Sequence, residues 1–239
     1  MITGIVVALP EELTTLTSKR IDKGHCVFIA DKLLVAYSGA GAKNATAAAE
    51  LLINKGATQL ISWGCAAALD ASLKPGDLAL ADNLIDVDDT EIAINSNWHE
   101  YANNLLAPYI KIHTGSLTQS ANIISSSKEK LHLQIITEAI ALDMESIAVA
   151  KAATKKNLPF LAIRAIVDPA DMDMPRAVSY AANAEGDIIL SRLLLFIALH
   201  PAELPGLIRL GLYFNAAKST LKRVAKQLDA LIHFPNMTQ

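Results

Sequence analysis

Short apolar runs recur along the first 168 residues of the chain, and their length and spacing constrain the fold more than any other feature. Each run is rich in β-branched or other apolar residues and is bounded by Gly, Pro, Asp or Asn, as buried strands are. The runs cover residues 2–9, 26–30, 33–39, 59–64, 77–87, 140–144 and 161–168. Residues 42–56 instead carry apolar side chains at helical spacing and end at Gly56, a typical helix stop. This alternation predicts an α/β fold with a largely parallel sheet covered by helices.

The strand pattern disappears from Ser179 onward, where only helical segments remain. We therefore divide the chain into a domain of residues 1–199 and a basic amphipathic helical extension of residues 200–239. The longest apolar run, Ile188–Leu199, is far shorter than the roughly 20 residues that cross a bilayer, and Arg192 interrupts it. The run does not predict a transmembrane helix.

The extension contains no acid between Leu204 and Gln227. Its apolar and basic side chains fit a helix that lies on a membrane surface, or a helix that packs on its own domain with its charges in water. Both possibilities stay open. The side chains concerned are Leu207, Ile208, Leu210, Leu212, Tyr213 and Phe214 on the apolar side, and Arg209, Lys218, Lys222, Arg223 and Lys226 on the basic side.

Composition excludes several classes of protein. With 52% hydrophobic residues, the 239-residue chain can bury a substantial core, while its net charge of −3 and lack of a dense basic tract argue against a nucleic-acid partner. Cys26 and Cys65 fit neither a metal site nor a disulfide framework. The N-terminus lacks the pattern of a signal peptide, so we expect a reduced, cytoplasmic protein.

Acids stand at strand ends in the stretch ALDMESIAVAKAATKKNLPFLAIRAIVDPAD, residues 141–171. The carboxyl ends of parallel strands open into a crevice that commonly holds ligands, so the acids here are candidate site residues: Asp143, Glu145, Asp168 and Asp171. Arg164 lies roughly 13 Å from Asp168 along the strand, too far to neutralise it. An unpaired buried carboxyl group has a raised pKa and could donate a proton near neutral pH. The alternative is that Asp168 caps a helix beginning near Pro169.

Three further segments have a structural and a functional interpretation. Glu11 and Glu12 follow Pro10 and suit a helix N-terminus, but one of them could act as a base. The turn at Gly39 and Gly41 could present backbone N–H groups to an anion or a sugar hydroxyl, or it could be an ordinary tight turn. The small residues of GCAAA, residues 64–68, could accommodate a flat ligand or close helix packing.

In this order and spacing, the segments ALPEEL, SGAGAKNA, WGCAAALDASLKPGD, LDMES and RAIVDPAD resemble the superfamily of purine nucleoside phosphorylases and methylthioadenosine/S-adenosylhomocysteine nucleosidases. Residues 199–226 resemble the hopanoid-associated branch, whose expected substrate is adenosylhopane. The resemblance implies a single three-layer domain with a mostly parallel, mixed central sheet flanked by helices. It also implies a homo-oligomer in which a neighbouring subunit contributes to the site, and no cofactor or metal.

The resemblance implies a role for each candidate residue. Asp168 would protonate purine N7, and Glu12 would orient or deprotonate the attacking water. Glu145 would accept hydrogen bonds from the ribose hydroxyls, while Met144 would pack against the sugar. Gly64, Cys65 and Ala66 would form the floor of the base pocket, and Gly39, Gly41 and Lys43 would form the loop at the nucleophile.

The nucleophile itself stays open between water and inorganic phosphate as co-substrate. The hexameric phosphorylases have an Arg where this chain has Ser62, and a dianion without cationic partners is costly to desolvate, which slightly favours water. Lys43 could nevertheless supply a cation. Two other departures from the nucleosidases are Val167 in place of Ser and Gly-Cys-Ala-Ala-Ala in place of Gly-Ser-Ala-Gly-Gly.

The sequence therefore predicts an enzyme that cleaves the N-glycosidic bond of an adenine nucleoside, with adenosylhopane as the first expectation. A methylthioadenosine/S-adenosylhomocysteine nucleosidase is the second. A nucleoside-binding protein without activity is the third, although a pure binder needs no proton donor.

Overall fold

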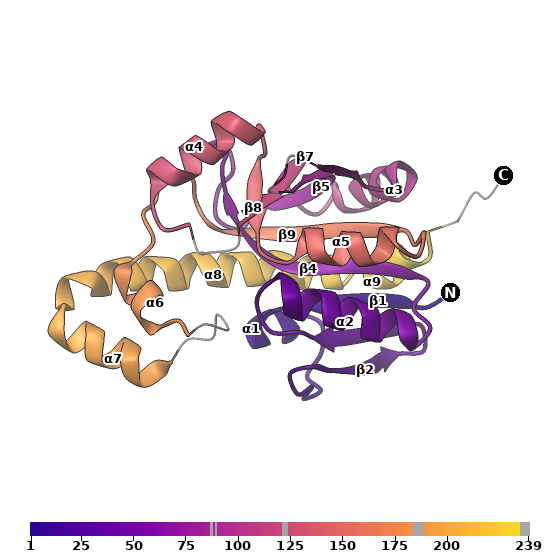
Figure 1. Cartoon of the computed structure of the whole chain (residues 1–239), viewed down its shortest axis with the longest axis horizontal. Coiled ribbons are helices and arrows are strands. Elements are labelled where there is room, and N and C mark those ends of the chain that lie inside the picture. Colours follow the sequence, from indigo (N-terminus) through magenta and orange to yellow (C-terminus); the bar gives the residue numbers. More distant parts are fainter. Residues whose placement is uncertain (87, 89, 121–123, 184–188, 235–239) are drawn as a thin grey trace.

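The computed structural model describes residues 1–86, 88, 90–120, 124–183 and 189–234. Val87, Ile188 and residues 235–239, which fall within segments discussed above, lie outside the described residues. The elements alternate between strands and helices over the first two thirds of the chain and are helical thereafter (Figure 1). The predicted α/β architecture is thereby confirmed.

A single mixed sheet of nine strands forms the centre of the domain. Its order is β2-β3-β1-β4-β8-β7-β5-β6, and β9 pairs with both β4 and β5. Neighbours β3, β1, β4 and β9 run parallel, as do β5, β7 and β8, whereas β9 runs antiparallel to β5. The strands are β1 (Thr3–Val7), β2 (His25–Ala30), β3 (Leu33–Tyr37), β4 (Gln59–Ala68), β5 (Leu78–Ile85), β6 (Glu91–Ala93), β7 (Ile112–Gln119), β8 (Ala141–Asp143) and β9 (Phe160–Asp168).

Each predicted apolar run contains a strand, but the sequence pattern missed β6 and β7. The polar side chains of β7, IHTGSLTQ, alternate with apolar ones too weakly to identify a buried strand. Strand β4 also continues to Ala68, four residues beyond the predicted end at Gly64. Residues 65–68 are therefore part of the sheet rather than a turn after it.

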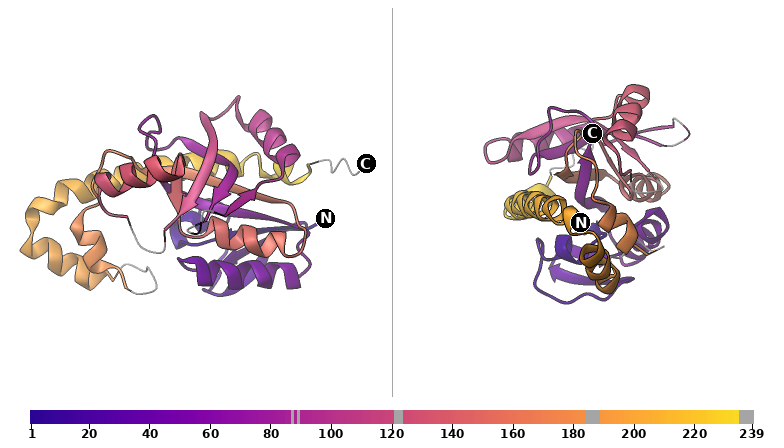
Figure 2. Two further views of the ribbon diagram at one scale, coloured as in Figure 1. Left: turned by 45° about the horizontal axis from the view of Figure 1, so that its top comes forward. Right: turned by 90° about the vertical axis from the view of Figure 1, so that its left-hand side faces the viewer.

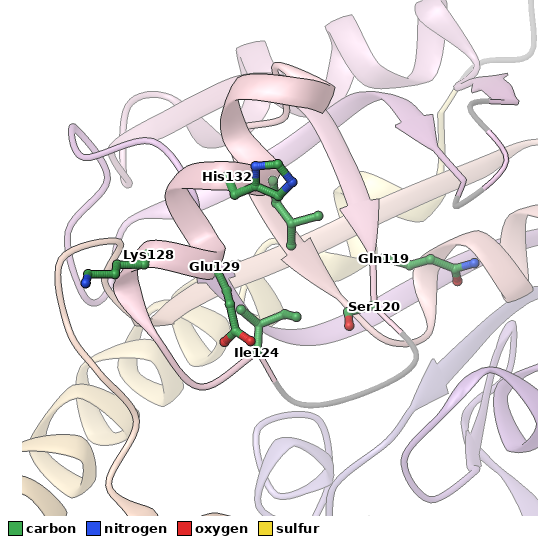
Figure 3. A pocket seen from close by; sticks show the side chains of 7 residues that line it. Gln119, Ser120, Ile124, Lys128, Glu129 and His132 are labelled. Atoms are coloured by element: carbon green, nitrogen blue, oxygen red, sulfur yellow. The ribbon is translucent and has the colours of Figure 1, made fainter.

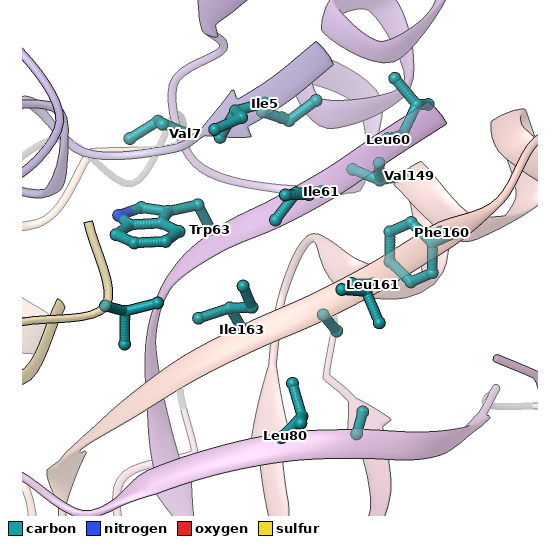
Figure 4. Packing of buried hydrophobic residues seen from close by; sticks show 14 of the residues in the cluster. Ile5, Val7, Leu60, Ile61, Trp63, Leu80, Val149, Phe160, Leu161 and Ile163 are labelled. Carbon is teal, nitrogen blue, oxygen red and sulfur yellow. The ribbon is translucent and has the colours of Figure 1, made fainter. Parts of the chain in front are cut away.

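The core lies where β1, β4, β9 and β5 cross the molecule (Figure 4). Trp63, Leu161 and Ile163 are fully buried there, and Trp63 Nε1 donates a hydrogen bond of 3.0 Å to Thr15 Oγ1. Burying one such large apolar side chain stabilises the fold by about 1.5–3 kcal/mol. The bond from Trp63 connects this core to the residues that follow β1.

Helices cover both faces of the sheet (Figures 1 and 2). Helices α2 and α5 pack together over β1 and β4, and the C-terminal half of α8 lies along β9. Helix α4 begins at a capping box between Ser126 and Glu129. The helices of the first part are α1 (Pro10–Leu13), α2 (Ala42–Asn54), α3 (Ser96–Leu106), α4 (Ser127–Thr137) and α5 (Ser146–Thr154).

An arm of helices projects from one end of the sheet (Figures 1 and 2). We use this name for α6 (Arg176–Ala181), α7 (Leu190–Leu199), the short 3-10 helix η1 (Pro201–Glu203) and the first half of α8 (Leu204–Ala225), up to Phe214. No residue of α7 is buried. Several large apolar side chains of α7 and α8 are exposed, with exposed fractions from 44% to 68%; these are Leu190, Leu194, Leu195, Leu199, Leu204, Ile208 and Leu212.

No single described helix is long and apolar enough to cross a membrane. By length and composition alone, α7 together with η1 and α8 would suffice, but this pair is bent by 110°.

The extension predicted for residues 200–239 is not one amphipathic helix on the outside of the domain. The second half of α8 buries Ala217, Leu221 and Val224, and Thr220 Oγ1 donates to the carbonyl oxygen of Gly76 at 2.5 Å. Of the basic side chains in this half, Lys222 and Arg223 are exposed and Lys218 is half-buried. The second half of α8 thus matches the alternative of a helix packed on its own domain, whereas the first half belongs to the arm.

The last described helix, α9 (Leu228–Ile232), is held by side chains from distant parts of the chain. Tyr101 and Trp98, both on α3, donate to the carbonyl oxygens of Ala230 and Leu231, and Gln59 of β4 donates to that of Ile232. The donor–acceptor distances are 3.1, 3.0 and 3.0 Å respectively. Residues up to 232 are therefore part of the folded domain.

Candidate active site

A cavity of about 250 Å³ lies at the carboxyl ends of β1, β8 and β9 and beside the last residues of β4. Most of the residues that the sequence pointed to line this cavity. They are Glu12, Cys65, Ala66, Met144, Glu145 and Asp168. The other lining residues are Ala8, Leu9, Ala40, Ala67, Ile124, Leu142, Asp143, Val167, Met174, Val178 and Phe214.

Glu12 is a buried carboxyl group at the start of the site. It sits in α1 immediately after β1, and only 3% of its surface is exposed. Its Oε1 accepts a hydrogen bond of 2.7 Å from Cys65 N, and its Oε2 accepts one of 3.0 Å from Leu9 N. Burial raises the pKa of Glu12 from 4.5 to about 7, although Arg164 and the two backbone donors act in the opposite direction. Such a group can accept a proton from water near neutral pH.

Gly64 leaves the space in which Glu12 and Arg164 meet. A Cβ atom at this position would lie 2.6 Å from both Glu12 Oε1 and Arg164 Nη1, closer than non-bonded atoms approach. Glycine at residue 64 is thus required by a close approach of two charged side chains. Gly64 itself does not line the cavity, whereas Cys65 and Ala66 do.

Arg164 is a buried site residue that the sequence analysis did not assign. It is 1% exposed in the middle of β9, where its Nε forms an ion pair with Asp143 Oδ2 and its Nη2 donates to Ser62 Oγ at 2.6 Å. Nη2 also lies 3.9 Å from Glu145 Oε2. Arg164 therefore does not neutralise Asp168, as expected. Its positive charge instead offsets the negative charges of Asp143 and Glu145.

Glu145 is oriented by the backbone on both sides. Its Oε1 accepts a hydrogen bond of 2.9 Å from Gly41 N, and its own N–H donates to Asp143 Oδ1 at 3.0 Å. Asp143 Oδ1 also accepts from Ser146 N at 2.9 Å, at the start of α5. Burial, followed by the nearby charge of Asp143, raises the pKa of Glu145. The carboxyl group faces the cavity with acceptor capacity to spare.

The expectation that Asp168 is unpaired is wrong. Asp168 is 1% exposed, and Lys130 Nζ from α4 lies 2.6 Å from its Oδ1. No local pattern indicated this ion pair, because Lys130 is 38 positions away on a helix with polar residues around it. Burial raises the pKa of Asp168, and Lys130 acts against this rise. The net result is still a carboxyl group whose pKa lies above its ordinary value.

The turn at Gly39 and Gly41 has the backbone conformation that favours glycine, with φ of 79° and 92°. Gly41 contributes its N–H to the site, as described for Glu145. Lys43, however, is exposed on α2 and is not among the residues that line the cavity. The basic side chain beside this turn is Lys23, whose Cε would lie 2.0 Å from a Cβ at Gly39.

One wall of the cavity is apolar. Met144, Val167 and Met174 line it together with Val178 from α6 and Phe214 from α8. The sequence analysis named Phe214 only as part of an amphipathic tail and did not assign Met174 or Val178. No local signal could have placed them, because the arm must fold back on the sheet before they meet β9.

A second hollow of about 500 Å³ lies beside α4 (Figure 3). Lys128, Glu129 and His132 of α4 line it, together with Gln119 and Ser120 at the end of β7. Ile124 is the one residue that lines both this hollow and the cavity. Of the candidate acids, Glu12, Asp143, Glu145 and Asp168 line the cavity, whereas Asp171 does not.

The cavity combines a buried acid, a buried base and a carboxylate acceptor around one apolar space. Among the residues that line it in the described part of the chain, none is basic and four carry a carboxyl group. The described residues contain no group of three or more His, Cys, Asp or Glu side chains that could hold a metal ion. This arrangement can protonate a leaving group on one side and activate water on the other.

Comparison with known proteins agrees with the fold and places the chain in a family. Residues 3–194 match the Phosphorylase superfamily. A 5'-methylthioadenosine/S-adenosylhomocysteine nucleosidase of Staphylococcus aureus (strain JH9) is 27% identical over 197 residues, covering 70% of this chain and 86% of that protein.

Two solved structures illustrate the likeness in fold. A 5'-methylthioadenosine/S-adenosylhomocysteine nucleosidase from Neisseria meningitidis, in complex with methylthio-immucillin-A, has a TM-score of 0.71 at 20% identity and covers 95% of this chain and 98% of its own. A futalosine hydrolase of Helicobacter pylori strain 26695 has a TM-score of 0.69 at 20% identity, with 96% of each chain covered. At these identities the likeness establishes the fold.

Proposed function

This chain belongs to the Phosphorylase superfamily, and we propose that it hydrolyses the N-glycosidic bond of an adenine nucleoside. The observation that carries this proposal is the meeting of Glu12, Glu145 and Asp168 in one cavity whose described lining contains no basic residue. The similar protein from Staphylococcus aureus is itself a nucleosidase.

In the proposed reaction, Asp168 gives its proton to N7 of the purine, so that adenine leaves as a neutral base. Glu145 accepts hydrogen bonds from the ribose hydroxyls and holds the sugar while positive charge develops on it. Glu12 takes a proton from the attacking water, whose oxygen bonds to C1′. The reaction needs no cofactor, because side chains and water supply the proton, the contacts and the nucleophile.

Water is favoured over phosphate as the nucleophile. A phosphate dianion bound in the cavity would lie among four carboxyl side chains without a basic residue in the described lining, and its desolvation would be uncompensated. The exposed position of Lys43 on α2 removes the support that this residue lent to a phosphorylase.

We further propose a substrate with a bulky apolar 5′ substituent, with adenosylhopane as the leading candidate. Support comes from the apolar wall of Met174, Val178 and Phe214, and from the resemblance of residues 199–226 to the hopanoid-associated branch. Methylthioadenosine or S-adenosylhomocysteine is the second candidate, favoured by the similarity to the nucleosidase from Staphylococcus aureus.

Release of adenine, followed by chromatography, tests these proposals with adenosylhopane, methylthioadenosine and S-adenosylhomocysteine, each with and without phosphate. We expect release without phosphate, fastest from adenosylhopane. Release that depends on phosphate would make the protein a phosphorylase. Release from methylthioadenosine alone would favour the second substrate, and binding without release would leave a nucleoside-binding protein.

The arm supports the proposal of peripheral contact with a membrane. Its exposed Leu and Ile side chains lie next to Arg192 and Arg209, and Phe214 connects it to the wall of the cavity. Its acid Glu203 is paired with Arg176 at 2.8 Å. Exposed apolar side chains with basic neighbours bind the headgroup region of anionic membranes, and each basic residue contributes about 1 kcal/mol there. A lipid-linked nucleoside would be taken from that surface.

Substitution within the arm tests membrane contact better than truncation, because removing residues after His200 would also remove the buried Ala217 and Leu221. We expect Leu195→Glu to reduce sedimentation with vesicles of phosphatidylcholine and phosphatidylglycerol by about tenfold. Leu131→Glu on α4 is the matched control, since the exposed fractions of the two leucines are 55% and 56%. Equal sedimentation of both variants would refute membrane contact through the arm.

The homo-oligomer implied by the resemblance stays a prediction. Light scattering of the same two variants checks it. If Leu195→Glu changes the mass of the assembly while vesicle binding is unaffected, the arm is a subunit interface.

A further inference from the structure

Lys130 is a buried basic side chain whose Nζ makes one ion pair and two hydrogen bonds. The side chain is fully buried on α4. Its Nζ lies 2.6 Å from Asp168 Oδ1 and donates to the carbonyl oxygens of Pro169 and Met172 at 2.9 and 2.8 Å. One side chain therefore fixes both the carboxyl group and the turn that follows β9.

The other oxygen of Asp168 is left for a ligand. Among the described residues, neither oxygen of Asp168 has a hydrogen-bond partner although both are buried. Oδ1 is in ion-pair contact with Lys130 Nζ, and Asp168 lines the cavity. A buried polar atom without a partner is unfavourable unless a bound molecule satisfies it. Lys130 holds Oδ1 in place, and Oδ2 is the atom available to exchange a proton.

We propose that Lys130 is a positioning residue for the general acid: it fixes the Asp168 carboxyl group and stabilises the carboxylate that remains once the proton has moved to the purine. This inference rests on the proposed function. The O–H bond of Asp168 breaks and an N–H bond forms at N7, while the electron pair of the C1′–N9 bond moves into the purine. Lys130 keeps its three protons throughout.

The electrostatic balance at Asp168 suits this role. An acid that was buried without a partner would hold its proton too tightly to release it, and a fully exposed pair would be ionised before the reaction. The charged groups that act on Asp168 are Lys130 from α4, which lowers its pKa, and Asp173 from the segment after β9, which raises it. Glu12, Asp143 and Glu145 line the same cavity from α1 and β8.

The pH dependence of adenine release separates this role from simple structural support. For Lys130→Met we expect kcat to fall by about tenfold or more, and the alkaline limb of the kcat profile to move up by about one pH unit, because the cation no longer favours ionised Asp168. Lys130→Arg should keep the limb near its wild-type position. Lys128→Met removes the same charge from the exposed side of α4 and should leave the profile unchanged (Figure 3). A lower kcat in Lys130→Met with an unmoved limb would overturn the proposal.

A double-mutant cycle gives a second test that needs no activity. Lys130→Met leaves a buried carboxylate without its cation, whereas Lys130→Met combined with Asp168→Asn does not. We therefore expect Lys130→Met to lower the urea midpoint at least twice as much in the wild-type background as in Asp168→Asn. Equal effects in both backgrounds, or failure of both to fold, would make Lys130 only a support for the turn. A protein that releases no adenine but shows the coupling would refute the proposed function and retain the ion pair.

Discussion

The stability of the Glu12→Gln variant relative to the wild type is expected to increase as the pH rises. Glu12 is almost fully buried, and its pKa is raised from 4.5 to about 7 in the folded protein. Below pH 4.5 the carboxyl group is protonated in both states. Between pH 4.5 and 7 the unfolded chain releases this proton while the folded protein retains it, so the folded state loses stability.

The size of the effect follows from the two pKa values. At about 1.4 kcal/mol per pH unit, the rise from 4.5 to about 7 corresponds to about 3 kcal/mol. Glutamine does not titrate. The difference in the free energy of unfolding between Glu12→Gln and the wild type should therefore change by this amount between pH 4.5 and about 7 and stay constant at higher pH. The amide can cost about 1–3 kcal/mol at every pH, because it cannot accept from both Leu9 N and Cys65 N as the carboxylate does.

Urea unfolding at a series of pH values from 4 to 8.5 measures this difference. Glu11→Gln is the control, since Glu11 lies on the same helix with its side chain exposed, and its difference curve should be flat. A flat curve for Glu12→Gln as well would show that the Glu12 carboxyl group is not held in a desolvated site. The reasoning that makes it the base would then be wrong.

Substitutions at three other positions test the site, two of them through adenine release and one through stability. Asp168→Asn should lower kcat by about a hundredfold or more while the nucleoside still binds in calorimetry, because the amide has no acidic proton; retention of half the activity would remove the acid role. Glu145→Ala should weaken binding and turnover together, and Glu145→Gln should be milder, whereas unchanged kinetics in both would exclude ribose contacts. Gly64→Ala should destabilise the protein by about 1–3 kcal/mol in urea, while Gly211→Ala, with open space around it, should not. In the wild type, release should decline as the pH falls below about 7 and Glu12 becomes protonated.

The acids of the site could be predicted because they follow strand ends. Glu145 follows an apolar run directly and Asp168 ends one, and the carboxyl ends of neighbouring parallel strands meet at one edge of the sheet. Local sequence was sufficient to make these two residues candidates, whereas the choice of Glu12 came from the family resemblance. The same argument identified the turn at Gly41, whose N–H reaches Glu145.

The partners of these acids could not be predicted, because they come from other elements. Lys130 stands among exposed positions of a helix, and its burial depends on how α4 docks against the turn after β9. Arg164 was visible in a buried strand, but its pairing with Asp143 depends on the pairing of β9 with β4 and of β4 with β8. Phe214 reaches the cavity only through the path of α8.

The attachment of α9 to α3 and β4 has a consequence for synthesis on the ribosome. The nine described strands are complete at Asp168, yet α8 and α9, which pack against β9 and α3 respectively, follow only at residues 204–232. At 5–20 residues per second, roughly 3 to 13 s pass between the synthesis of residue 168 and that of residue 232. During this interval the nascent chain exposes the apolar surface that Leu221, Val224 and Leu231 later cover. The growing chain therefore needs protection from aggregation until its last helix has left the exit tunnel.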